Sequence, residues 1–205
     1  MDGVDAEQVM LLREVLGSSG WLERTGEFGR ALRVNARTPG GLLLVGTPAE
    51  DPWHLAAHLD DESRYGAVPA LSPTLVRWSP PDDAPAHLRI GLERLERAQR
   101  GETLFVVAED EAPVPLLERV DDARRTGAVI MTMDGGDREL QGLAHEALTV
   151  EPGEALLSFD GAQHLVSAAA GQEAAAPRAR PGLRDRLARV LDKISGPAID
   201  DRHLP

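Results

Sequence analysis

The chain has 205 residues, 42% of them apolar, which is enough to bury one substantial core and leave a short appendage. Its net charge is −12 and it contains no cysteine, which excludes disulfides, thiolate nucleophiles and Cys-ligated metal sites. An acidic chain repels nucleic acid and anionic membranes. No run approaches the roughly 18 apolar residues of a spanning helix, so we expect a cytoplasmic protein without stable membrane insertion.

The first part of the chain is expected to supply helices that cover the core. Residues 5–16 carry Val9, Leu12 and Leu16 near helical spacing and end in the turn sequence GSSG. Residues 21–37 continue with apolar positions but contain two glycines, so we expect them to be helical only in part.

Five short apolar runs are expected to be strands, and helical patterns separate them. The strands are residues 42–45, 75–78, 104–107, 129–132 and 148–150. The helices are a segment through Leu55 and Leu59, then residues 87–99, 114–125, 138–145 and 156–170. This alternation predicts an α/β fold over residues 1–170, a three-layer αβα sandwich with a mainly parallel five-stranded sheet.

The C-terminal part is expected to lie outside that domain. Residues 171–181 are rich in Ala, Gly and Pro and indicate a linker, and residues 197–205 indicate a disordered tail. Residues 182–196 form a basic amphipathic helix pattern. From residue 178 onward seven basic residues stand against four acidic ones, a net +3, which leaves −15 for the preceding residues. The apolar stripe of this helix consists of Leu183, Leu187, Val190, Leu191 and Ile194.

We expect this stripe to bind protein, either a partner, a second copy of the chain or the acidic body of the same molecule. A membrane-surface role is the alternative. Stable anchoring to a membrane is disfavoured, because the apolar face has only about five aliphatic residues and no aromatic one.

The segment from residue 117 to residue 150 carries a family resemblance. A helix ends in ARRTG at 123–127 and runs into AVIMTMDGGDRELQGLAHEALTVEP at 128–152, with Leu143-Ala144 at a helix end and Glu146 before a short strand. This order resembles the sugar isomerase (SIS) domain family over residues 5–170. The resemblance implies a SIS-like fold, a homodimer, and a phosphosugar held by the turns after the first and third strands, at a helix N-terminus.

The turns supply the candidate ligand-binding residues. Gly46 and Thr47 follow the first strand, and Thr132 and Asp134 lie after the fourth, where they can hydrogen-bond a ligand's hydroxyls. The simpler interpretation is that Thr132 finishes the strand and Asp134 begins a turn. The third-strand turn, Ala108 to Pro113, has neither hydroxyl nor glycine. Each of its three carboxylates would cost a bound phosphate on the order of 1 kcal/mol.

For acid–base chemistry, the resemblance implies a Glu or His near the carboxyl edge of the sheet. Glu154 and His164 are the candidates by position, and ordinary surface roles are the alternative. His54, His58 and Glu62 lie one helical turn apart, a spacing that can chelate zinc or nickel. A third ligand at defined spacing is missing, so we expect no metal, and we expect no cofactor.

Two hypotheses remain open. The first is a non-catalytic SIS-like binding or regulatory module that acts through protein contacts. The alternative is a sugar-phosphate isomerase or phosphosugar-binding regulator, with Gly46, Thr47, Thr132 and Glu154 lining its site.

Overall fold

The computed structural model describes residues 17, 19–80, 85, 89–153 and 156–172. Its centre is a five-stranded sheet with the order β2-β1-β3-β4-β5, and every strand pair is parallel. The strands are β1 (Leu42–Val45), β2 (Thr74–Val76), β3 (Thr103–Ala108), β4 (Val129–Asp134) and β5 (Glu146–Thr149). The predicted α/β fold with a five-stranded parallel sheet is therefore confirmed.

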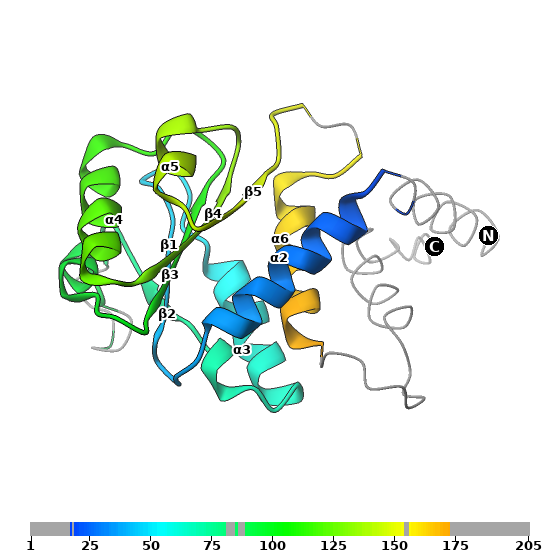
Figure 1. The fold of residues 1–205 in the computed structure, drawn as a ribbon, viewed down its shortest axis with the longest axis horizontal. Coiled ribbons are helices and arrows are strands. Elements are labelled where there is room, and N and C mark those ends of the chain that lie inside the picture. The colour runs from blue at the N-terminus through cyan, green and yellow to red at the C-terminus, as the bar shows by residue number, and fades with distance from the viewer. Residues whose placement is uncertain (1–16, 18, 81–84, 86–88, 154–155, 173–205) are drawn as a thin grey trace, which may run out of the picture.

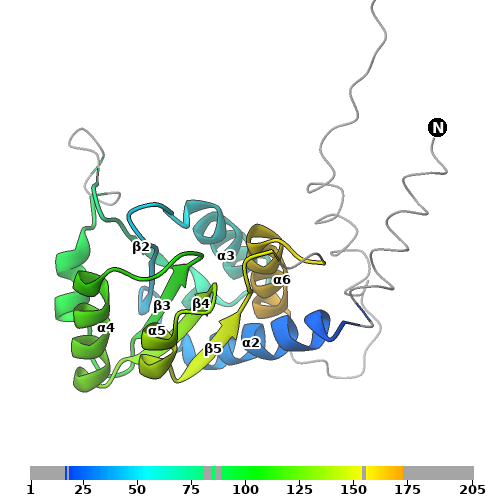
Figure 2. The same cartoon turned by 90° about the horizontal axis from the view of Figure 1, so that it is seen from above.

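Helices cover both faces of the sheet, as Figures 1 and 2 show. One face carries α2 (Trp21–Asn35), α3 (Trp53–Tyr65) and α6 (Phe159–Gly171). The other carries η3 (Leu92–Arg97), α4 (Val114–Thr126) and α5 (Arg138–Leu143). A short 3₁₀ turn, η1 (Pro69–Leu71), precedes β2.

Successive side chains of each strand point to opposite faces of the sheet, so the core has two halves. In β3, Phe105 and Val107 pack with α2, α3 and α6, whereas Leu104 and Val106 pack with α4 and α5. All six β3 residues are buried, because this strand lies in the middle of the sheet and both of its faces are covered. That double burial explains why the run TLFVVA is apolar without a polar alternation.

The helix α2 is longer and more regular than its two glycines predict. It runs without a break from Trp21 to Asn35. A Cβ at Gly29 would lie 2.6 Å from the Ala169 Cβ and 2.9 Å from the Val166 carbonyl oxygen. Gly29 is thus required by the close approach of α2 to α6, and tertiary packing outweighs its low helix propensity.

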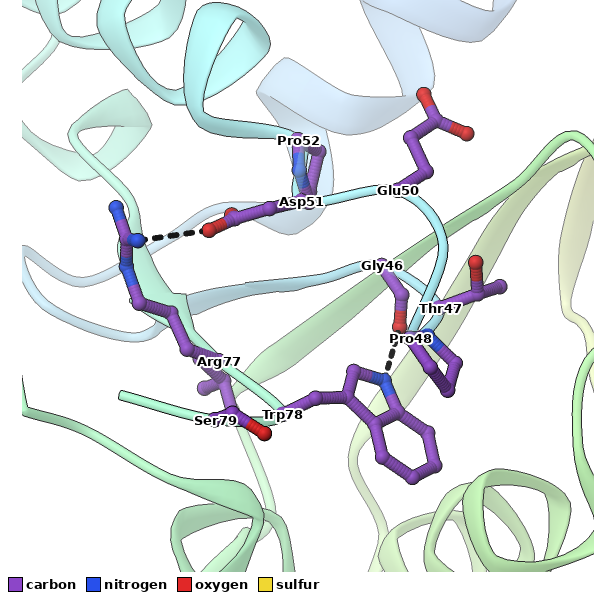
Figure 3. A pocket seen from close by; sticks show the side chains of 10 residues that line it. Gly46, Thr47, Pro48, Glu50, Asp51, Pro52, Arg77, Trp78 and Ser79 are labelled. Carbon is purple, nitrogen blue, oxygen red and sulfur yellow. Dashed lines mark hydrogen bonds and ion pairs between the residues drawn. The ribbon is translucent and has the colours of Figure 1, made fainter. Parts of the chain in front are cut away.

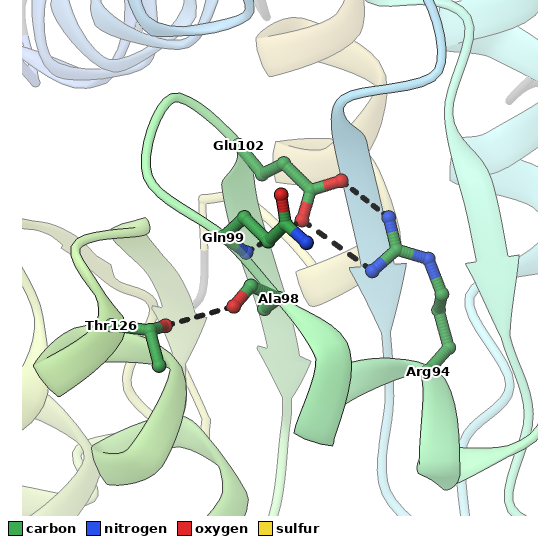
Figure 4. A network of polar contacts seen from close by, with 5 residues as sticks. All are labelled: Arg94, Ala98, Gln99, Glu102 and Thr126. Atoms are coloured by element: carbon green, nitrogen blue, oxygen red, sulfur yellow. Dashed lines mark hydrogen bonds and ion pairs between the residues drawn. The ribbon is translucent and has the colours of Figure 1, made fainter.

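The α-helix predicted over residues 87–99 is wrong in the described part of that segment, which contains only the 3₁₀ helix η3. Gly91 is extended, with φ −96° and ψ −177°, and Ala98 is extended at the other end. The end of η3 is tied down by Glu102, which pairs with Arg94 and accepts a 2.8 Å hydrogen bond from the Gln99 N–H (Figure 4). Beside it, the Thr126 hydroxyl donates to the Ala98 carbonyl oxygen at 2.9 Å.

The fifth strand begins earlier than predicted, and the helix before it is correspondingly shorter. The His145 N–H donates to the Ile130 carbonyl oxygen at 2.8 Å, and the His145 Nδ1 accepts from the Ile130 N–H at 2.9 Å. Pairing with β4 therefore starts at His145 and ends α5 at Leu143. Glu146 lies inside β5, not before it.

Several predictions lie outside the described residues. These are the helix over 5–16, the basic helix over 182–196, the tail over 197–205 and the linker over 171–181 apart from its first two residues. Of those two, Gly171 belongs to α6 and Gln172 follows the end of that helix. The domain boundaries remain predictions. Among the helices of the described residues, none has the length and apolar character needed to cross a bilayer.

Candidate functional site

The carboxyl ends of the strands meet at one edge of the sheet, and the chain reverses its direction of progress at β1. From β1 the first crossover leads to β2 on one side, and the next leads back past β1 to β3 on the other. In open parallel sheets, ligands bind outside the carboxyl ends of the strands at such a switch point. The turns after β1, β2 and β3 are therefore the expected position of a ligand site.

A pocket of about 170 Å³ lies between the turns that follow β1 and β2 (Figure 3). We call it the β1–β2 pocket. Its lining residues come from these two turns and the adjoining strand end: Gly46, Thr47, Pro48, Glu50, Asp51, Pro52, Val76, Arg77, Trp78 and Ser79.

Two contacts shape this pocket. The Arg77 guanidinium pairs with the Asp51 carboxylate at 2.8 Å, and both side chains are partly exposed. The Trp78 indole N–H donates a 2.9 Å hydrogen bond to the Gly46 carbonyl oxygen, so the ring is held against the end of β1 (Figure 3). Burial raises the pKa of Asp51, and the neighbouring Arg77 opposes that rise.

The Glu50 carboxylate points away from Trp78 (Figure 3) and links three elements. Its Oε1 accepts a 3.0 Å hydrogen bond from the Gln163 side chain of α6, and its Oε2 accepts from the Glu109 N–H at 3.4 Å. Burial is the main reason that the pKa of Glu50 is raised. The nearby carboxylates of Glu109 and Asp160 also raise it, while the two hydrogen bonds lower it.

Of the four predicted ligand-binding residues, the structure brings Gly46 and Thr47 into the β1–β2 pocket. Gly46 must lack a side chain there, because a Cβ would collide with the Glu50 carbonyl oxygen and lie 2.6 Å from the Pro52 Cδ. Thr47 is 5% exposed.

Thr132 and Asp134 are not among the residues that line this pocket. Both are fully buried at the end of β4. The Thr132 hydroxyl donates to the Asp134 carboxylate at 3.2 Å, and that carboxylate also accepts from the Gly136 N–H at 2.9 Å and the Gln141 amide at 2.7 Å. These bonds hold the turn after β4, and a ligand-binding role for the two residues remains a prediction.

Of the two predicted catalytic residues, His164 is not among the residues that line this pocket. His164 lies on α6, where its ring meets the His58 ring edge-on with centroids 4.3 Å apart. Glu154 lies outside the described residues. A catalytic role for either residue remains a prediction.

In the sequence, the histidines of α3 and the acidic residues after β3 are the other candidate sites for a metal ion. His54 packs against the Trp53 ring, with centroids 3.4 Å apart, and Glu109, Asp110 and Glu111 are exposed on the turn after β3. In the part of the chain that the structure describes, no group of three or more His, Cys, Asp or Glu side chains is placed to hold a metal ion.

A second, wider depression of about 580 Å³ lies between the turns after β3 and β4. Beside it, Asp137 accepts hydrogen bonds from the Ala112 N–H at 2.8 Å and from the first turn of α5, from the Glu139 N–H at 2.9 Å and the Leu140 N–H at 3.1 Å. Asp137 thus joins the acidic turn after β3 to the start of α5.

Sequence reasoning missed Arg77, Trp78 and Gln163. The first two stand directly at the end of the second predicted strand, so their place at the carboxyl edge was open to prediction. Gln163 lies 113 residues from Glu50, and no local pattern indicates that contact.

Comparisons with known proteins find a likeness only among solved structures. No protein-family model and no curated protein sequence matches the chain. Each of the three matches given below has a TM-score below 0.5 and a sequence identity below 25%. We therefore draw no functional conclusion from them.

The first is a protein named as sugar-binding from Salmonella typhimurium LT2, with 17% identity and a TM-score of 0.45; the match covers 83% of this chain and 54% of that one. The second is a protein named as a phosphosugar isomerase from Silicibacter pomeroyi DSS-3, with 12% identity, a TM-score of 0.46 and coverage of 81% and 46%. The third is the Vibrio vulnificus NanR protein complexed with ManNAc-6P, with 15% identity, a TM-score of 0.40 and coverage of 82% and 59%. The chain spans about half the length of these proteins.

Proposed function

We propose that this chain is a non-catalytic SIS-like binding module that holds a small, hydroxyl-rich ligand, of the class of an unphosphorylated sugar, in the β1–β2 pocket. The observation that carries the proposal is the combination of groups around that pocket. An aromatic ring, a guanidinium–carboxylate pair and the hydroxyl residues Thr47 and Ser79 line it, and they come from two turns at the carboxyl edge of the sheet.

Each of these groups matches a feature of a sugar. The Arg77–Asp51 pair offers donors and acceptors in a fixed arrangement, and hydroxyl groups both donate and accept. The Trp78 ring, restrained by its bond to Gly46, supplies apolar surface for the C–H face of a sugar ring. Small-molecule sites commonly combine apolar walls with a few placed polar groups.

The charges of the pocket favour an uncharged ligand over a phosphorylated one. Glu50 and Asp51 are adjacent, and Arg77, the one arginine among the described residues that line the pocket, already pairs with Asp51. A like-charge pair separated by roughly 6 Å costs about 1 kcal/mol at an effective dielectric constant of about 50. A phosphosugar would meet this cost at Glu50, and the Arg77 charge that could offset it is shared with Asp51, so the phosphosugar-binding alternative is the weaker one.

The proposal of a non-catalytic role rests on how the pocket carboxylates are engaged. Asp51 is paired with Arg77, and Glu50 is hydrogen-bonded to Gln163 and the Glu109 N–H. A general acid or base must be within reach of the proton that it transfers, and here both carboxylates already have partners inside the protein.

Thermal-shift measurements of the full-length chain with a panel of neutral sugars and their phosphates test this proposal. We expect a neutral sugar to raise the melting temperature, and we expect Arg77→Gln to abolish that rise. Arg64→Gln is the matched control, because Arg64 also pairs with an aspartate, Asp60, but on the exposed surface of α3. A rise caused only by phosphosugars, or one that Arg77→Gln leaves unchanged, would contradict the proposal.

The protein-contact role remains part of the proposal. We infer it from the sequence of residues 182–196, whose basic residues complement the acidic charge of the preceding chain. The partner is either a second copy of the chain, as the resemblance implies, or another acidic protein surface.

A further inference from the structure

We propose that the Glu50 carboxylate is an internal anion that fills the crevice between the ends of β1 and β3, and that it excludes external oxyanions such as inorganic phosphate from this position. The inference goes beyond the proposed function, because this crevice lies on the other side of β1 from the β1–β2 pocket. It assigns to Glu50 the role of disfavouring anionic ligands at this edge of the sheet.

The topology makes the β1–β3 crevice the expected ligand position. β1 and β3 are neighbours in the sheet, yet the chain visits β2 between them, so the turns after β1 and β3 lead away in opposite directions. Backbone amides at the carboxyl ends of such strands are oriented toward the crevice and bind anions readily.

In this chain two donors at the crevice are already used by Glu50. Its two carboxylate oxygens accept from the Glu109 N–H, at 3.4 Å, and from the Gln163 amide, at 3.0 Å. The first donor belongs to the turn after β3 and the second to α6. An incoming oxyanion would need the same donors, so the carboxylate stands where that oxyanion would bind.

The backbone holds Glu50 in this place. The Glu50 N–H donates to the Thr47 carbonyl oxygen at 3.2 Å, which folds the turn after β1 back on itself. The Glu50 carbonyl oxygen then occupies the space beside Gly46 where a side chain would begin. On the next turn, the Glu109 carbonyl oxygen occupies the equivalent space beside Gly135. The turns after β1, β3 and β4 thus pack together, and neither Gly46 nor Gly135 has room for a side chain.

The surroundings make the negative charge of Glu50 costly, which fits a group that takes the place of a ligand. Both of its hydrogen-bond donors are neutral amides. The carboxylates of Glu109 and Asp160 lie close enough to affect its ionisation, and both favour the protonated form. Removing the Glu50 side chain therefore takes the acceptor away from both donors, and removing or neutralising it reduces the negative charge at the crevice.

The first arm of the test follows the Glu109 amide by NMR in the ¹⁵N-labelled full-length chain. The background is Glu109→Gln, which keeps the backbone N–H and removes the carboxyl group of that residue. We expect the amide resonance of residue 109 to titrate with a midpoint above 4.5, the ordinary pKa of Glu50, and to lose this titration when Glu50→Gln is added. A resonance that titrates equally with and without Glu50 overturns the proposed contact.

The second arm adds inorganic phosphate at neutral pH, against sodium chloride of equal ionic strength. We expect no saturable shift of the Glu109 amide in the wild-type chain and a saturable shift in Glu50→Ala. If the alanine variant does not fold, the phosphate titration of the Glu109 amide is measured in Glu50→Gln instead. Phosphate binding to the wild type, or its absence from every folded Glu50 variant, overturns the proposal. No sugar enters either arm, so this outcome is independent of the sugar panel.

Discussion

The Trp78 indole N–H donates a 2.9 Å hydrogen bond to the backbone carbonyl oxygen of Gly46. The last paired residues of β1 and β2 are Val45 and Val76. The indole bond therefore connects the two segments just beyond the point where their strand pairing ends. It stabilises a three-residue edge strand and at the same time places one wall of the β1–β2 pocket.

Replacing Trp78 by phenylalanine should destabilise the protein. The change removes the indole donor and leaves the Gly46 carbonyl oxygen without it, at a cost of about 1 kcal/mol. The measurement is the free energy of unfolding from urea denaturation. Trp53→Phe is the control, because Trp53 is 52% exposed, and it should change stability by less than about 0.5 kcal/mol. Equal effects at the two tryptophans would show that the indole bond contributes nothing.

Two glycines in α2 should respond in opposite directions to alanine. A Cβ at Gly29 would meet the Ala169 Cβ and the backbone of α6, so Gly29→Ala should cost about 1–3 kcal/mol. At Gly26 the nearest atom is the Arg30 Nη1, 3.7 Å away, so Gly26→Ala should gain about 0.5–1 kcal/mol through helix propensity. Thermal melts of both variants measure this difference. A stabilising Gly29→Ala would refute the close packing of α2 on α6.

Asp137 should matter more for stability than the exposed acidic residues near it. Asp137→Ala removes the N-cap of α5 and leaves the Ala112 N–H unpaired, at a cost of about 1–2 kcal/mol. Asp110→Ala, on the exposed turn after β3, should cost less than about 0.5 kcal/mol. Guanidinium denaturation measures both. If Asp110→Ala proved the more damaging change, the structural role assigned to Asp137 would be wrong.

Stability should depend on pH through Glu50. Burial raises the pKa of this carboxyl group above its ordinary 4.5, so the folded protein binds its proton more tightly than the unfolded chain does. The resulting stabilisation is fully present below pH 4.5 and is lost as the pH rises through the raised pKa of the folded state.

Glu50→Gln cannot ionise, so the stability of the wild type relative to this variant should fall as the pH increases through that window. Unfolding free energies of both proteins, measured at a series of pH values, give the comparison. Parallel curves for the two proteins would show that the pKa of Glu50 is not raised by folding.

Deleting residues 181–205 should leave the described domain folded and remove a protein contact. The domain core lies within residues 21–171, and the deleted segment contains the predicted apolar stripe. Sedimentation velocity and thermal melts of the full-length and shortened chains measure the two effects. Unfolding of the shortened chain would show that the segment belongs to the core, and unchanged association would remove the assigned contact role.

Much of the fold followed from local patterns. β3 and β4 are readable because strands buried on both faces are nearly continuous apolar runs, and α4 because Leu116, Val120 and Ala123 repeat at helical spacing. The same reasoning failed at residues 87–99. There the apolar spacing predicts an α-helix, but the extended backbone at Gly91 and the Arg94–Glu102 pair favour a short 3₁₀ helix instead.

The sequence by itself determined the α/β class, the parallel sheet and the position of the acidic turn after β3, because each depends on composition and spacing within about ten residues. Only the tertiary structure decided which turns form a pocket, since Arg77 meets Asp51 and Glu50 meets both Glu109 and Gln163 across long separations in the chain. Those contacts form where the crossovers bring the strand ends together. The residue types at each turn do not indicate which other turn they will contact.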